Sequence, residues 1–130
     1  MNNILQFTIP LIPPTVNMYT RHTRQGRHYK TKLALAWEQA FAIYAPRDEW
    51  VTAKQFKVTL DVYLGPKDKL DVDNAPKMCL DCIARHRLLR NKSGRNVSDS
   101  YVKALAVFIW DSKKDRANGA HTDITVEAWK

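Results

Sequence analysis

The chain has 130 residues, of which 45% are hydrophobic and 26% are charged, as is ordinary for one globular domain. Lys and Arg exceed Asp and Glu by 21 − 13 = 8. This balance favours a polyanionic partner such as nucleic acid, although many small basic proteins have none. No long apolar run and no signal-like N-terminus is present. We therefore expect a cytoplasmic protein without a membrane partner.

Residue patterns in the first third of the chain predict a strand, a loop and a helix. Polar and apolar residues alternate over residues 3–9, and prolines at 10, 13 and 14 then end the strand. Residues 15–30 have no clear period and include a glycine, so we expect a loop. Residues 31–44 have helical spacing, with Thr31 as the N-cap. The apolar face of this helix is expected to comprise Leu33, Trp37, Ala40, Phe41 and Tyr44.

The remaining patterns predict a mixed α+β fold. The alternation over residues 56–64 is the clearest strand signal in the chain, and a second helix is expected over about residues 77–87. The run 101–110 is apolar enough for a central strand. A charged hairpin loop over 111–120 and a closing strand over 121–129 complete the chain. We predict a single compact domain over residues 1–130, with a mixed sheet of about four strands and two main helices.

The two cysteines form a Cys-x-x-Cys pair at Cys79 and Cys82. A zinc site needs about four ligands, and only His86 lies close by in the sequence. Positions 75, 78, 79, 82 and 83 instead follow the spacing of a buried helix face. We therefore interpret the cysteines as core thiols.

Two basic segments are candidates for binding nucleic acid. Residues 15–30 interleave cations with tyrosines, which suits phosphate clamping and base stacking, unless the segment is only a solvated loop. Residues 85–96 either face DNA or form an exposed helix end whose cations complement the dipole. The candidate DNA-binding residues in these segments are Asn17, Tyr19, Arg21, His22, Arg24, Arg27, Arg90 and Arg95.

A pair of carboxylates stands where the strand-like run gives way to the second helix. Asp71 and Asp73 are two residues apart, so in an extended segment they point to the same side, with Cα atoms about 6.5 Å apart. Carboxylates are the hard oxygen ligands that Mg²⁺ favours. Lys77 adds an ammonium one helical turn beyond Asp73, and Lys69 and Asn74 are further candidates for contacting DNA. Asp73 can alternatively be a helix N-cap, but capping does not account for Asp71.

Asp99 is a third candidate carboxylate, just before the expected strand 101–110. It would approach Asp71 and Asp73 if that strand neighbours the one ending near Leu64. Three such carboxylates would hold one or two Mg²⁺ ions, with Mn²⁺ as a possible substitute, that activate water and stabilise the leaving oxygen in phosphodiester hydrolysis. Lys77 would steady the attacking water or neutralise charge on the phosphate.

These residues resemble the signature of RusA-type Holliday junction resolvases, the crossover junction endodeoxyribonucleases. The central match is Asp71-x-Asp73-Asn74-x-x-Lys77-x-x-x-Asp81-x-Ile83. The N-terminal match is Pro13-Pro14-Thr15-x-Asn17-x-Tyr19-x-Arg21-His22, and Asp99-x-x-Val102 resembles the second acidic motif.

The resemblance implies a small homodimeric Mg²⁺-dependent endonuclease, of a kind often carried by phages and prophages. Its partner would be four-way junction DNA in recombination and repair, cut by paired symmetric nicks. Asp71, Asp73 and Asp99 match the catalytic, metal-binding aspartates of the family, and Lys77 matches its essential lysine.

One position and one segment depart from the family pattern. Ser98 stands where the second motif usually has another acidic residue, and the segment from Arg85 to Val97 is longer and more basic than usual. One alternative function is therefore a junction- or duplex-binding protein with a degenerate, non-catalytic acidic site. A ribonuclease with similar metal chemistry is another, because the contact that distinguishes RNA from DNA is not visible in a sequence.

Overall fold

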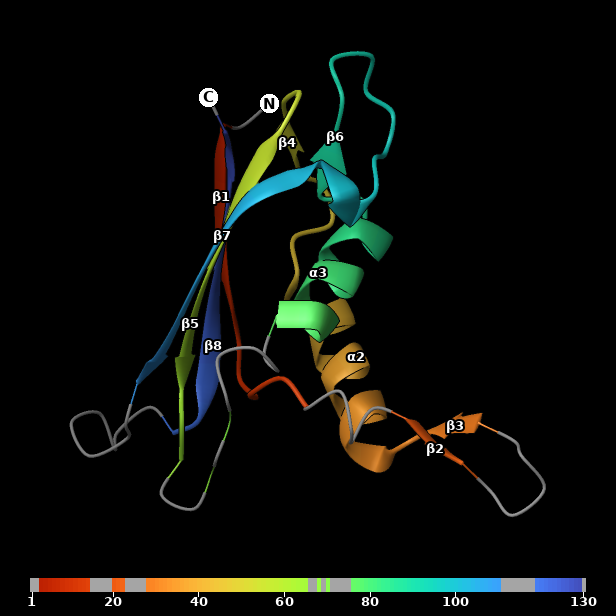
Figure 1. Ribbon diagram of the computed structural model, residues 1–130, viewed down its shortest axis with the longest axis vertical. Coiled ribbons are helices and arrows are strands. Elements are labelled where there is room, and N and C mark those ends of the chain that lie inside the picture. Colours follow the sequence, from red (N-terminus) through yellow and green to blue (C-terminus); the bar gives the residue numbers. More distant parts are fainter. Residues whose placement is uncertain are drawn as a thin grey trace.

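A four-stranded mixed sheet, with helices α2 and α3 on one of its faces, makes up most of the part of the chain that the structure describes (Figure 1). The structure is a computed structural model that describes residues 3–14, 20–22, 28–65, 68, 70, 76–110 and 119–129. These residues form a single compact α+β domain, as the sequence predicts. None of the helices in these ranges is long and apolar enough to cross a membrane.

The main sheet has the strand order β1-β8-β5-β7. Its strands are β1 (Ile4–Ile9), β8 (His121–Ala128), β5 (Phe56–Tyr63) and β7 (Val102–Trp110). β8 is antiparallel to β1 and to β5, whereas β5 and β7 are parallel. All four strands lie close to their predicted positions. Alternating residues give β1, β5 and β8 a period of two, and an apolar run indicated β7.

Two predictions about β7 are wrong. β7 is an edge strand rather than a central one, and three of its large apolar side chains are exposed. The predicted hairpin between β7 and β8 does not form, because β5 lies between these strands. The apolar run was typical of a strand buried on both sides, but strand order depends on non-local pairing that a single segment does not reveal. The predicted loop 111–120 lies outside the described residues except for Gly119 and Ala120.

Two smaller sheets extend the fold. β2 (Thr20–His22) and β3 (His28–Lys30) pair antiparallel, so the prediction of a loop throughout 15–30 is wrong for these residues. Such short polar strands have no hydrophobic alternation by which to recognise them. β4 (Val51–Thr52) and β6 (Leu89–Arg90) pair parallel beside the main sheet.

Helix α2 (Lys32–Tyr44) begins as predicted, with the Thr31 side-chain oxygen accepting the Ala34 N–H at 3.3 Å. Its buried residues are Ala34, Trp37 and Phe41. The predicted apolar face is wrong at its flanks, because Leu33 and Tyr44 are 55% and 52% exposed. A helix against a sheet buries a narrower stripe than its apolar residues alone suggest.

Helix α3 (Pro76–Arg85) connects the parallel strands β5 and β7, which require a crossover of this kind. Met78, Cys79, Cys82 and Ile83 are buried, which confirms the predicted stripe at these positions, whereas position 75 lies outside the described residues. Burial raises the pKa of Cys79 and raises that of Cys82 to about 11. Both cysteines are free thiols in the core and are therefore poor nucleophiles at neutral pH.

Candidate functional site

The charged side of α3 carries Lys77, Asp81 and Arg85 at successive four-residue intervals. This spacing places the three side chains on one face of the helix, next to the buried stripe. Lys77 is exposed and Asp81 is half-buried. The positive charges of Lys77 and Arg85 both lower the pKa of Asp81, so both cations lie within electrostatic range of this carboxylate.

Asp99 approaches the same carboxylate from another element. It begins the 3₁₀ helix η1 (Asp99–Tyr101), which contacts α3. Burial is the largest cause that raises the pKa of Asp81, and the negative charge of Asp99 raises it further. The net pKa of Asp81 is raised despite the two cations. Lys77, Asp81, Arg85 and Asp99 are hereafter called the α3–η1 charge cluster.

The structure brings together the two predicted catalytic residues that it describes. The charge of Lys77 lowers the pKa of Asp81 and the charge of Asp99 raises it, so both residues lie within electrostatic range of Asp81. Asp71, Asp73, Asn74 and Lys69 lie outside the described residues, so their predicted roles stay predictions. Among the described residues, no group of three or more His, Cys, Asp or Glu side chains could hold a metal ion.

Asp99 reaches this cluster by a route other than the expected one. β7 does neighbour β5, but the strands are parallel and Val102 pairs with Phe56. Asp99 therefore lies beside the beginning of β5, about 25 Å from its far end near Tyr63. The contact between η1 and the crossover helix α3 brings Asp99 to the cluster.

Asp81 was missed as a site residue, although its four-residue spacing from Lys77 indicated a pair across one helical turn. What the spacing does not reveal is partial burial and the proximity of Asp99. Both disfavour the ionised carboxylate in the folded protein. A carboxylate that is partly buried beside a second carboxylate is more typical of a functional site than of a solvated helix face.

This penalty predicts that Asp81→Asn stabilises the fold at neutral pH. A raised folded-state pKa costs stability when the group ionises, and the cost disappears below the ordinary carboxyl pKa of about 4, where both states are protonated. We expect a higher Tm for the variant at pH 7 and no increase at pH 3, measured by circular dichroism. Asp48→Asn, at an exposed position after α2, is the control. A lower Tm for Asp81→Asn at pH 7 would mean that Lys77 and Arg85 more than offset the penalty.

Ser98, where the resembled family has an acid, has a structural role. It is the N-cap of η1, and its Oγ accepts the Ser100 N–H at 3.4 Å and lies 2.6 Å from the Ser100 Oγ. Serine and aspartate are both good N-caps, so either residue is compatible with this turn.

The basic segment 85–96 begins at the exposed end of α3, continues through β6 and then forms a turn over residues 91–95. The Asn91 side chain accepts the N–H groups of Ser93 and Arg95 at 2.9 and 3.0 Å. The Arg90 guanidinium lies 3.8 Å from the Trp50 ring centre, and Arg90 Nε donates to the Arg87 carbonyl. Arg95 is exposed. Of the other predicted DNA-binding residues, Arg21 and His22 lie in β2, and Asn17, Tyr19, Arg24 and Arg27 lie outside the described residues.

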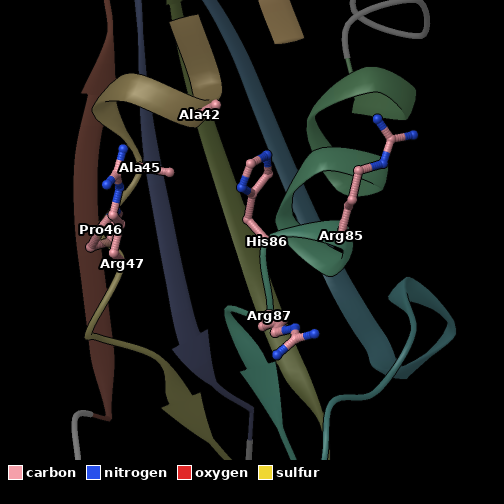
Figure 2. Close-up of a pocket in the computed structure, with 7 residues that line it drawn as sticks. All are labelled: Ala42, Ala45, Pro46, Arg47, Arg85, His86 and Arg87. Carbon is pink, nitrogen blue, oxygen red and sulfur yellow. The ribbon is translucent and has the colours of Figure 1, made fainter. Parts of the chain in front are cut away.

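A basic pocket of about 370 Å³ lies between the ends of α2 and α3. Figure 2 shows His86 in the middle, with Arg47 on one side, Arg85 on the other and Arg87 below. Burial and the charge of Arg85 lower the pKa of His86, whose ring packs against Phe41 with centroids 5.1 Å apart. Arg85 also pairs with Glu38 at 3.3 Å. Arg85 and Arg87 belong to one basic segment of the sequence, but nothing in the sequence indicated that Arg47 lines the same pocket.

Arg87 has a positive φ of 64°, a conformation that favours glycine. It ends α3 in a Schellman motif, in which the Leu88 N–H donates to the Ile83 carbonyl and the Arg87 N–H donates to the Ala84 carbonyl. A non-glycine residue here costs about 1 kcal/mol. The strained backbone presents an exposed cation at the pocket.

A scan against models of known protein families found no match to this chain, and a search of curated proteins also found none.

Proposed function

We propose that this protein is a Mg²⁺-dependent, structure-selective DNA endonuclease of the RusA type, which resolves four-way junctions as a homodimer. The observation that carries the proposal is that η1, which begins at Asp99, contacts helix α3, which carries Lys77, so that both residues lie within electrostatic range of Asp81 although they are 99 − 77 = 22 residues apart. Both residues belong to the catalytic set predicted from the motif. Their meeting at Asp81, which is itself part of the motif, supports a shared function.

The carboxylates of the proposed metal ligands Asp71, Asp73 and Asp99 are oxygen donors of the kind that a divalent cation prefers. Asp99 raises the pKa of Asp81 by charge repulsion, and such repulsion is what a bound cation offsets. Asp71, Asp73 and Asp99 would hold Mg²⁺, which when bound polarises the scissile phosphate and activates water. Asp81 would contribute negative charge beside them. Lys77, which is exposed, would neutralise the charge that builds up on the phosphate.

The surface next to the cluster suits a DNA backbone. Helix α3 connects the cluster to the basic pocket, since Arg85 belongs to the cluster and also lines the pocket. From Lys77 to Arg85 the helix rises about 12 Å. A strand bound along this face would contact cations beyond the scissile phosphate, which supports orientation as well as affinity.

Substrate selectivity tests the proposal against its alternatives. Labelled four-way DNA junction, linear duplex and structured RNA would each be incubated with the protein in Mg²⁺ and in EDTA. The proposal predicts a Mg²⁺-dependent product from the junction alone. Cleavage of RNA but not of DNA would favour a ribonuclease. Salt-sensitive DNA binding without product in Mg²⁺ or Mn²⁺ would favour the non-catalytic alternative, which the serine at position 98 supports.

Arg87→Gly is expected to stabilise the protein while weakening its binding to DNA. Glycine relieves the positive φ, so the free energy of unfolding should rise by about 1 kcal/mol in urea titrations. Loss of one phosphate contact should reduce the salt dependence of log K by about one unit. Lys57→Gln, which removes an equal charge paired with Glu127 on the main sheet, is the control and should bind normally. Unchanged DNA affinity in Arg87→Gly would remove the pocket from the proposed interface.

A further inference from the structure

The outer edge of β7 is open. β7 pairs with β5 along one side, and no strand that the structure describes pairs with its other side. Edge strands usually carry charges or prolines that prevent pairing with another chain. β7 has nine residues, no proline, and one charge, Lys103, near its beginning. The strand therefore presents a long row of backbone donors and acceptors that a further strand would satisfy.

Exposed apolar side chains lie on both faces of this edge. Val107 pairs with the buried Leu60, so Leu105, two residues earlier, shares the core-facing side of the sheet and is 43% exposed. Phe108 and Trp110 pair with Asp61 and Tyr63 on the opposite face and are 48% and 47% exposed. A partner stacked on one face of the sheet would leave the other face uncovered. A strand added along the edge would approach both.

The middle of β7, residues 104–108, is complementary to itself when it is reversed. If two copies of β7 pair antiparallel about Ala106, each residue lies opposite the residue that is equally far from Ala106 on the other side, so that position 105 faces 107 and position 104 faces 108. Ala104 then faces Phe108, so a large aromatic residue on the outer face meets a small one. The register shift beside Lys103 takes Val102 off this face, because Val102 pairs with the buried Phe56 and packs against the core. On the other face Leu105 meets Val107.

We propose that a second copy of this chain pairs its β7 with this β7, antiparallel, about a two-fold axis at Ala106. The two four-stranded sheets then form one continuous sheet of eight strands, with a self-complementary interface. That the protein is a homodimer rests on the proposed function; the surface that joins the copies rests on β7. The two Val102 residues would lie about 26 Å apart, which places the two copies of the α3–η1 charge cluster toward opposite ends of the paired strands.

Sedimentation velocity at micromolar concentration tests the interface without any nuclease assay. We expect about 30 kDa for the wild type, twice the 15.0 kDa of one chain. Leu105→Lys should sediment as a folded monomer. Leu105 is already partly exposed in one chain, so the lysine should disrupt the pairing of the two β7 strands and not the fold. Ile43→Lys, at a 69% exposed position on α2, is the matched control and should remain dimeric. A monomeric wild type would overturn the proposal.

Cysteine cross-linking tests the register. Ala106→Cys should form a disulfide-linked dimer under mild oxidation, because the two copies of residue 106 face each other at the axis. Ala104→Cys should not, because its two copies would lie four residues apart along the strands, about 13 Å. The native cysteines are buried and leave the background low. A wild-type dimer that resists cross-linking at position 106 and survives Leu105→Lys would use another surface and contradict the proposal, with the proposed nuclease activity unaffected.

Discussion

Asp73→Asn is expected to lose Mg²⁺-dependent cleavage by a factor on the order of 10³ while binding a four-way junction at least as tightly as the wild type. Asparagine has nearly the same shape as aspartate but lacks the negative charge that favours a divalent cation. The same loss of charge reduces repulsion between the site and the DNA phosphates. Cleavage and binding should therefore change in opposite directions, which a folding defect would not produce.

Single-turnover cleavage and electrophoretic mobility shift with the same junction measure the two quantities. Asp68→Asn is the matched control, since it makes the same chemical change on the connection between β5 and α3. Asp68 accepts the Gly65 N–H at 2.7 Å through its side chain, and asparagine retains an oxygen acceptor. The control should cut at nearly the normal rate. If Asp73→Asn also cut at the normal rate, the assignment of the metal ligands would be wrong.

Phe41→Ala is expected to cost about 3–5 kcal/mol of unfolding free energy, the largest effect on stability among the changes considered. Phe41 is fully buried at the centre of the interface between the helices and the sheet. Its ring meets Phe7 of β1 edge-on at 5.5 Å, Trp37 of α2 at 6.2 Å and His86 at 5.1 Å. Truncation therefore removes contacts to three segments at once and leaves a cavity. A loss of this size is a large part of the 5–15 kcal/mol typical of a domain.

Urea unfolding followed by tryptophan fluorescence measures this loss. Ile43→Ala, two residues further along the same helix, is the control because Ile43 is 69% exposed. Its cost should stay within about 0.5 kcal/mol. A cost below about 1.5 kcal/mol for Phe41→Ala would show that the core refills the cavity or that α2 contributes little to cooperative unfolding.

Local patterns in the sequence were sufficient for the main elements but not for their arrangement. The alternation in β5 and the spacing of Met78, Cys79 and Cys82 predicted a strand and a buried helix face, because burial repeats with the period of each element. The position of β7 at the edge could not be predicted, because strand order depends on which distant segments pair. β2 and β3 were missed because backbone pairing alone defines them.

The sequence likewise indicated some residues of the candidate site but not others. Residue type and spacing indicated Lys77 and Asp99, and the structure brings both within electrostatic range of Asp81. The role of Asp81 depends on partial burial and on a contact between α3 and η1, both of which arise only on folding. The strain at Arg87 was equally invisible, because the sequence there lacks the glycine that usually marks such a helix end.

The most direct test of the central claim is the pattern of nicks in a four-way junction whose four strands are labelled in turn, in Mg²⁺ and in EDTA. The proposed function predicts paired nicks at symmetric positions in two opposing strands, with ends that ligase can reseal, and no product in EDTA. Tight binding of the junction without any nick in Mg²⁺ or Mn²⁺ would contradict it.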